Sequence, residues 1–285
     1  MKLIAIDLDG TLLSDEGTIS TANRSAILDA QQKGHIVCIA SGRSLPDTKE
    51  ILRLAKLDCP IIAGNGATSF HCGEHVHKLY LDKEVAKRII PTLRDLHVYY
   101  EVYVDEGVLV ETGMEEVLWL EMEQAGLSNE SPTSESLQRT IAIQHSQHGL
   151  QFIDKYETIA PDYVGIYKIF VLSFLKEKRD QLKKMLELEG DVSITSSGRE
   201  KLEIAHHRAS KGYALERMAN RFGIPMENTV AIGDNFNDIS MFEKAGISIS
   251  MGNAEEEVKQ VSTYTTSNYN EEGVAKAIQR YVLSL

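Results

Sequence analysis

The sequence KLIAIDLDGTLL, residues 2–13, places two aspartates directly after a short apolar run. Residues 3–6 show little polar alternation, which is typical of a strand that is covered on both faces. Asp7 and Asp9 would repel each other at the end of this strand unless a cation lay between them. Magnesium binds carboxylate, carbonyl and water oxygens and leaves room for a substrate phosphate. The stretch therefore predicts a buried strand that ends in a Mg²⁺ site.

The composition limits the kinds of partner. The chain has 285 residues, with 30 Lys and Arg against 42 Asp and Glu, so its formal net charge is −12. This charge disfavours nucleic acid as a partner, and no apolar stretch approaches the length of a membrane span. The three cysteines are scattered and lack metal-site spacing. We expect a cytoplasmic protein, a monomer or weak homodimer, whose partner is a small phosphorylated metabolite and neither nucleic acid nor a membrane.

A second strand follows the first through a helix. Residues 21–34 have a helical pattern that closes in Gly34, and residues 36–40 form another apolar run, which ends at Ser41. A strand, a helix and a strand in this order predict a right-handed parallel crossover. Because ligands gather beyond the carboxyl ends of such strands, we expect Asp7, Asp9 and Ser41 to share one crevice.

The character of the chain changes from about Asp82. The region up to about Asp191 mixes amphipathic helices with alternating strands, and none of these strands ends in clustered carboxylates. Its polar stretch 128–136 is expected to be a loop. Near Val192 the core is expected to resume with two adjacent strands, 192–196 and 201–205. We therefore predict an α/β fold with a Rossmann-like parallel-sheet core, residues 1–82 and 192–285, and an inserted α+β cap domain, residues 83–191.

Further polar motifs complete a candidate site. Ser41, Gly42 and Arg43 follow the second apolar run, Lys211 begins a predicted helix, and Gly233–Asp238 (GDNFND) follows another apolar run. Four aspartates (Asp7, Asp9, Asp234 and Asp238) with one lysine and one serine suit a divalent cation and a transferable anionic group. Phosphoryl transfer needs neutralised oxygens and an in-line nucleophile, and a carboxylate can be that nucleophile.

These motifs, in this order and spacing, resemble those of the haloacid dehalogenase superfamily, in its phosphatase branch. The segments DLDGTLL, ASGR, GNGA and GDNFND together look like the Cof-type group, which has the larger α+β cap (C2B-like) between the second and third motifs. One departure is His206-His207-Arg208, where relatives often have Pro or Gly before the motif-three lysine. It affects local substrate contacts and leaves the mechanism intact.

The resemblance implies a role for each motif residue. Asp7 resembles the nucleophile, Asp9 the general acid and base whose carbonyl also binds the metal, and Lys211 the cation that ties Asp7 to the phosphate. The implied catalytic set is Asp7, Asp9, Ser41 and Lys211. The implied phosphate-binding set is Leu8, Ser41, Gly42, Lys211 and Asn237. The implied metal set is Asp7, Asp9, Asp234 and Asp238, in which Asp238 orients the metal shell or Lys211.

The function that follows is a Mg²⁺-dependent phosphatase. It would hydrolyse phosphomonoesters of small metabolites, such as sugar phosphates, through an aspartyl-phosphate intermediate, with the cap closing over the leaving group. One alternative is a phosphomutase on sugar phosphates, because the aspartyl phosphate can be passed back to a sugar. Another is a signalling module that accepts a phosphoryl group on Asp7; the long insertion and Asp9, which would speed hydrolysis, disfavour it.

Overall fold

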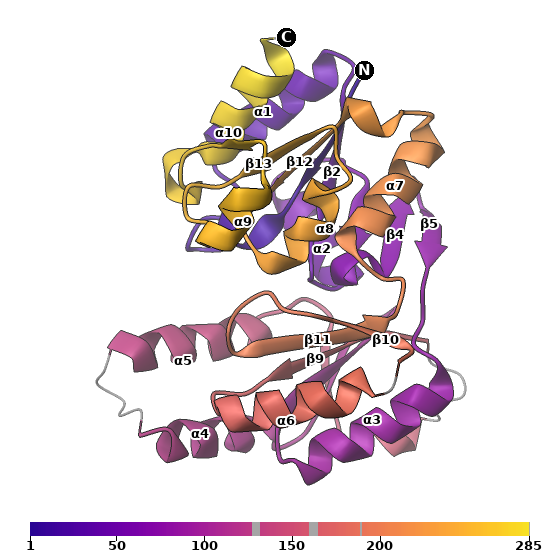
Figure 1. Cartoon of the computed structure of the whole chain (residues 1–285), viewed down its shortest axis with the longest axis vertical. Helices are drawn as coiled ribbons and strands as arrows, with labels where there is room; N and C mark the ends of the chain where they lie inside the picture. Colours follow the sequence, from indigo (N-terminus) through magenta and orange to yellow (C-terminus); the bar gives the residue numbers. More distant parts are fainter. Residues whose placement is uncertain (127–131, 160–164, 189, 285) are drawn as a thin grey trace. The chain divides into compact units, whose positions relative to one another are not determined.

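The computed structural model describes residues 1–126, 132–159, 165–188 and 190–284. The chain divides into two compact units (Figure 1). The core unit comprises Met1–Lys78 and Ala209–Leu285, and the inserted unit comprises Leu79–Arg208. Both chain ends therefore belong to the core unit. The predicted class, α/β with a core built on a largely parallel sheet, is confirmed.

The core unit contains an eight-stranded sheet in the order β14-β13-β12-β1-β2-β3-β4-β5. Its strands are β1 (Leu3–Ile6), β2 (Ile36–Ala40), β3 (Ile61–Ala63), β4 (Thr68–His71), β5 (Glu74–Lys78), β12 (Thr229–Gly233), β13 (Ile247–Ser250) and β14 (Tyr264–Thr265). The strands from β14 to β3 pair in parallel, and β4 and β5 add an antiparallel hairpin. Strand β1 lies between β2 and β12, so the segments that follow these three strands meet at one edge.

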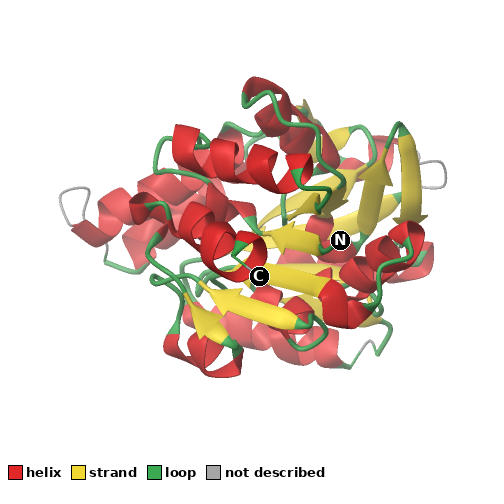
Figure 2. Cartoon of the chain, turned by 90° about the horizontal axis from the view of Figure 1, so that it is seen from above, coloured by secondary structure: helices red, strands yellow, loops and turns green. Residues whose placement is uncertain are grey.

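Helices cover both faces of this sheet (Figure 2). They are α1 (Thr21–Gln32), α2 (Leu45–Leu54), α7 (Lys211–Phe222), α8 (Ile239–Phe242), α9 (Glu256–Val261) and α10 (Gly273–Ile278). Ile4 and Ile6 of β1 pack with residues of α1, α2 and α10, whereas Leu3 and Ala5 pack with residues of α7, α8 and α9. Burial on both faces explains why β1 shows no polar alternation.

The inserted unit contains a six-stranded sheet in the order β10-β11-β9-β6-β7-β8. Its elements are β6 (Tyr99–Val104), β7 (Gly107–Glu111), β8 (Leu150–Ile153), β9 (Ile166–Leu172), β10 (Val192–Thr195), β11 (Lys201–His206), α3 (Lys83–Asp95), α4 (Met114–Gln124), α5 (Pro132–His145) and α6 (Lys176–Glu187). One face packs its apolar side chains against α3 and α6. The alternate residues Glu101, Lys168 and Glu203 are buried polar groups.

The structure moves the second predicted domain boundary. Strand β11 pairs antiparallel with β9, and β10 pairs with β11, so both belong to the sheet of the inserted unit. The prediction that the core resumes near Val192 is therefore wrong, because strand periodicity does not specify which sheet a strand joins. The first boundary also falls slightly earlier than residue 82: Leu81 lies in the apolar core of the inserted unit, and its N–H donates to the carbonyl of Ile166 at 2.7 Å.

Two further observations concern the remaining sequence predictions. Residues 128–131 of the predicted polar loop lie outside the described residues, and the rest of that stretch, from Pro132, begins helix α5. Among the described residues, no helix combines the length and the apolar composition that crossing a membrane requires.

Candidate active site

The candidate site is built at the carboxyl edge of the core sheet. Asp7 follows β1, Ser41 follows β2 and Asp234 follows β12, while Lys211 begins α7. Parallel strands that lie side by side place the residues after them at a common edge. Ser210 determines that α7 begins at Lys211, because its hydroxyl caps the helix by accepting from the N–H of Tyr213 at 3.1 Å.

Lys211 lies at the centre of the site. Its side chain is fully buried, and its Nζ atom donates to Asp7 Oδ1 and to Asp238 Oδ1, at 2.6 Å each. Burial by itself would lower the pKa of Lys211, but the charges of Asp238 and Asp7 outweigh it and raise the pKa. Lys211 is therefore a buried cation that is shared by two carboxylates.

Both oxygens of Asp238 are already engaged. Oδ1 accepts from Lys211, and Oδ2 accepts from the backbone N–H groups of Asp234 and Asn235 at 2.8 and 3.0 Å. A Cβ atom on Gly233 would lie 2.4 Å from this carboxylate, so only glycine fits before Asp234. Asp238 thus accepts hydrogen bonds from Lys211 and from the backbone of Asp234 and Asn235.

Three buried carboxylates form a group with metal-ligand spacing. Oxygen atoms of Asp7, Asp234 and Asp238 lie within 4.8 Å of one another, and no other group of three such ligands occurs in the described part of the chain. Burial raises the pKa of Asp7 well above its ordinary value, against the charge of Lys211. Burial and then the charge of Asp238 raise the pKa of Asp234 to about 7. One buried lysine thus leaves this group short of positive charge, which a divalent cation would supply.

The ligand atoms of this group suit Mg²⁺. Carboxylate oxygens are the ligands that this ion prefers. Thr11 Oγ1 donates to Asp234 Oδ1 at 2.9 Å, which orients that carboxylate. Gly10 has a φ of +77°, and a Cβ there would lie 2.4 Å from Asp234 Oδ2. The residue therefore has to be glycine for Asp234 to reach its place.

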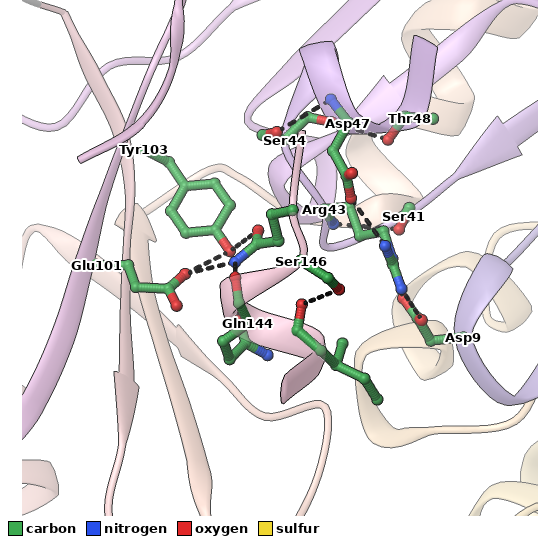
Figure 3. Close-up of polar contacts among 12 residues, drawn as sticks. Asp9, Ser41, Arg43, Ser44, Asp47, Thr48, Glu101, Tyr103, Gln144 and Ser146 are labelled. Carbon is green, nitrogen blue, oxygen red and sulfur yellow. Dashed lines mark hydrogen bonds and ion pairs between the residues drawn. The ribbon is translucent and has the colours of Figure 1, made fainter. Parts of the chain in front are cut away.

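The carboxylate of Asp9 forms an ion pair with Arg43 (Figure 3). The Nε and Nη2 atoms of Arg43 donate to the two Asp9 oxygens at 2.9 and 2.7 Å, and its Nη1 atom donates to Asp47 at 2.8 Å. The Asp9 side chain is 53% exposed, whereas that of Asp47 is 2% exposed. Arg43 therefore pairs both with the predicted general acid and with a buried aspartate.

Ser41 is fully buried and does not cap the following helix. Its Oγ atom accepts from the backbone N–H of Arg43 at 3.1 Å, while Ser44 caps α2 by accepting from the N–H of Asp47. The hydroxyl of Ser41 is therefore not needed to cap α2. Leu8 is buried in the turn after β1, and Gly42 lies between Ser41 and Arg43.

Two asparagines to which the sequence analysis gave no site role contact this site. Asn65 follows β3 and accepts at Oδ1 from Asn237 Nδ2, at 3.0 Å. Asn253 donates from Nδ2 to the carbonyl of Gly10 at 2.8 Å. The segment GNGA, which contributed to the family resemblance, contains Asn65 but implied no role for it, and Asn253 has no motif around it. Both contacts span long sequence separations, which local patterns do not encode.

Comparison with known proteins places the chain in a family. A model of the haloacid dehalogenase-like hydrolase family matches residues 4–278. The chain is 38% identical over 281 residues to the 5-amino-6-(5-phospho-D-ribitylamino)uracil phosphatase YwtE of Bacillus subtilis, covering 98% of each chain. It is 34% identical to the phosphatase YwpJ of the same organism, over 96% of this chain and 98% of the relative. The structure of a haloacid dehalogenase-like hydrolase from B. subtilis superposes with a TM-score of 0.87 at 34% identity, covering 99% of this chain and all of the other.

The chain therefore belongs to the haloacid dehalogenase-like hydrolases, as its four motifs indicated. Within this family it is an enzyme of the phosphoric monoester hydrolase class.

Proposed function

We propose that this protein is a Mg²⁺-dependent phosphatase that removes the phosphate of small phosphorylated metabolites through an aspartyl phosphate on Asp7. The observation that carries the proposal is the buried arrangement in which Lys211 pairs with Asp7 beside Asp234 and Asp238. A lysine alone cannot balance these carboxylates and an incoming phosphate. A divalent ion together with Lys211 would do so, which is the charge balance that phosphoryl transfer requires.

Asp7 and Asp234 would hold the metal ion through their carboxylates, and the backbone carbonyl of Asp9 would be a third ligand, as the motif implies. Asp238 supports them indirectly, since Lys211 and two backbone N–H groups occupy its oxygens. When bound, Mg²⁺ would neutralise phosphate oxygens in the transition state. The same charge would keep Asp7 ionised, which a nucleophile requires.

The residues of the chain then divide the chemistry between two steps. In the first, an oxygen of the Asp7 carboxylate attacks phosphorus, the ester P–O bond breaks, and Asp9 gives a proton to the leaving oxygen. In the second, Asp9 takes a proton from water, which attacks the phosphoryl group and releases inorganic phosphate and free Asp7. Lys211, Ser41 and Asn237, with the backbone N–H groups of Leu8 and Gly42, would hold the phosphoryl oxygens during both steps.

The pairing of Arg43 with Asp9 gives this scheme a resting state. The guanidinium binds both Asp9 oxygens, and Asp47 holds the guanidinium from the other side. To protonate a leaving oxygen, Asp9 has to release at least one of these hydrogen bonds. Because its side chain is 53% exposed, it can do so without exposing an apolar core.

The substrates of relatives define the compounds to test. Two B. subtilis relatives, at 38% and 30% identity, are named as phosphatases of 5-amino-6-(5-phospho-D-ribitylamino)uracil, and an Escherichia coli relative at 27% identity is named as a pyridoxal phosphate phosphatase. We propose a phosphorylated sugar, sugar alcohol or cofactor precursor of this size as the substrate, in the cytoplasm.

The test is phosphate release by the purified protein. An aryl phosphate should be hydrolysed with Mg²⁺ and not with a chelator, and a panel of the compounds above with sugar phosphates should then give a preferred substrate. Analysis of the organic product separates a phosphatase, which releases free phosphate, from a mutase, which returns it to another position of the sugar. Absence of turnover on every compound with Mg²⁺ present would contradict the proposal.

A further inference from the structure

The loop after β3 has an unusual backbone. Gly64, Asn65 and Gly66 all have positive φ angles, of 57°, 54° and 89°. Two of these residues are glycines, which adopt such angles freely, whereas Asn65 is an L residue with a side chain in the left-handed region. A third glycine would satisfy the backbone better. The side chain of Asn65 therefore has a purpose that the turn itself does not require.

The side chain of Asn65 contacts Asn237, and its backbone contacts Ser41, the first residue of the loop after β2 (the Ser41 loop). Asn65 is only 3% exposed; its Oδ1 accepts from Asn237 Nδ2 at 3.0 Å, and its N–H donates to the carbonyl of Ser41 at 3.0 Å. The two partners come from the segments after β12 and β2. Asn65, to which the motifs assigned no role, thus links two of the predicted phosphate-binding residues.

The same loop also adjoins Lys211. A Cβ atom on Gly66 would lie 2.0 Å from the carbonyl oxygen of Ser210, so the loop packs directly on the start of α7. The N–H of Gly64 donates to the carbonyl of Arg43 at 3.0 Å, and the ring Nε2 of His77 lies 2.9 Å from the carbonyl oxygen of Gly66. These contacts fix the loop from several sides and leave little freedom to Asn65.

Asn237 depends on this contact for its orientation. Its side chain is buried, and no donor among the described residues reaches its Oδ1 atom. The hydrogen bond from Nδ2 to Asn65 is the contact that sets the rotation of the amide. Without it, the amide could turn about its last bond and would present its donor and acceptor in a different direction.

We propose that Asn65 is a positioning residue, which orients the amide of Asn237 and the Ser41 loop for the phosphoryl group. The proposal rests on the proposed function, since Asn237 and Ser41 bind phosphate in that scheme. Asn65 itself need not touch the substrate.

The test uses Asn65→Gly, which keeps the positive φ and removes only the amide. With Mg²⁺ present, we expect the dissociation constant for inorganic phosphate, measured by calorimetry, to rise about tenfold, the effect of losing one aligned hydrogen bond. The kcat/KM for an aryl phosphate should fall by about the same factor. The unfolding temperature should not fall, because glycine relieves the backbone. Asn237→Ala should give a similar loss, and the double variant should lose little more than either single variant.

The matched control is Lys56→Gly. Lys56 is exposed, has a φ of 53° and lies in the same unit, so it tests the effect of removing a side chain at a left-handed residue without the contact. Its phosphate affinity and kcat/KM should equal those of the wild type.

The outcomes separate the two proposals. If the wild type lacks turnover, the proposed function fails, and the phosphate affinities still test Asn65. Equal phosphate affinity in wild type and Asn65→Gly, absence of binding in both included, overturns the positioning role. Losses that simply add in the double variant also overturn it, because Asn65 would then act independently of Asn237. Should the glycine variant fail to fold, Asn237→Ala, which leaves the left-handed loop unchanged, is compared with the wild type, and equal phosphate affinity again overturns the positioning role.

Discussion

The Nζ atom of Lys211 donates to Oδ1 of Asp7 at 2.6 Å, and the two residues are 204 positions apart in the sequence. The lysine is fully buried and the aspartate nearly so. In this environment an unpaired charge would be very costly, so each group depends on the other for its ionised form. The contact ties the predicted nucleophile to the start of α7.

Replacing Lys211 with methionine should therefore destabilise the protein as well as inactivate it. The variant leaves Asp7 and Asp238 without their shared cation, and loss of one partner of a buried pair costs about 3–5 kcal/mol of unfolding free energy. Denaturant titration with a chelator present measures this. The control is Lys244→Met, which breaks an exposed pair with Glu216 and should cost less than about 1 kcal/mol. Equal losses in the two variants would contradict the central role of Lys211.

Asp7→Asn should abolish turnover and keep the fold. The amide cannot act as the nucleophile, so we expect kcat to fall by more than about a thousandfold. Burial and the neighbouring carboxylates disfavour the Asp7 charge, so without metal the neutral variant should unfold at the same or a higher temperature. Phosphate release and thermal unfolding measure the two effects. The exposed Asp58→Asn is the control, and hydrolysis retained by Asp7→Asn would exclude Asp7 as the nucleophile.

Gly10→Ala should weaken metal binding. The added Cβ would lie 2.4 Å from Asp234 Oδ2, so the carboxylate has to move. We expect the affinity for Mg²⁺ to fall by about 10–100-fold, the usual range for a displaced neighbour of a metal ligand. Calorimetric titration with Mg²⁺ measures it.

The control for this variant is Gly17→Ala. Gly17 has a similar φ of +72°, and no heavy atom of the described residues, apart from its own and its chain neighbours', lies within 4 Å of its Cβ position. It should carry the backbone strain, about 1–2 kcal/mol, and bind Mg²⁺ normally. If both alanines weaken binding equally, strain and not the contact with Asp234 is the cause.

The inserted unit should lose stability in acid because Glu203 becomes protonated. Burial acts to raise the pKa of Glu203, but the charge of Lys168 at 2.7 Å and the hydroxyl of Ser197 outweigh it and hold the pKa below its ordinary value of 4.5. A depressed folded pKa means that the stabilisation is complete above the unfolded pKa and is lost as the pH falls through the folded one. Glu203→Gln should therefore lose less stability than the wild type between about pH 5 and pH 3.

Glu101 provides the opposite case in the same sheet. Burial raises its pKa, although Gln147, Tyr99 and Tyr103 donate to it. Its charged form opposes folding, so the wild type should gain stability relative to Glu101→Gln as the pH falls. Unfolding midpoints of both variants measure the two slopes: the change from Glu203 falls between about pH 5 and pH 3, and that from Glu101 falls above the ordinary value of 4.5, because its pKa is raised. Parallel slopes would show that neither carboxylate titrates as the structure indicates.

The sequence predicts where the strands lie along the chain better than it predicts which strands pair. Strands β1, β2 and β12 and the polar residues after them follow from apolar runs that end abruptly. The pattern also places β10 and β11 correctly along the chain, yet they join the sheet of the inserted unit, because strand pairing depends on which partner edge is available.

The sequence by itself determined the order and type of most elements, the spacing of the motifs and hence the family. These features are local: periodicity, turn residues and short motifs are properties of neighbouring positions. Only the tertiary structure decided that Lys211 is buried between Asp7 and Asp238, that Asp9 pairs with Arg43 and that Asn65 holds Asn237. Such contacts join segments far apart in the chain, and their burial and charge balance arise only when the sheet and its helices pack together.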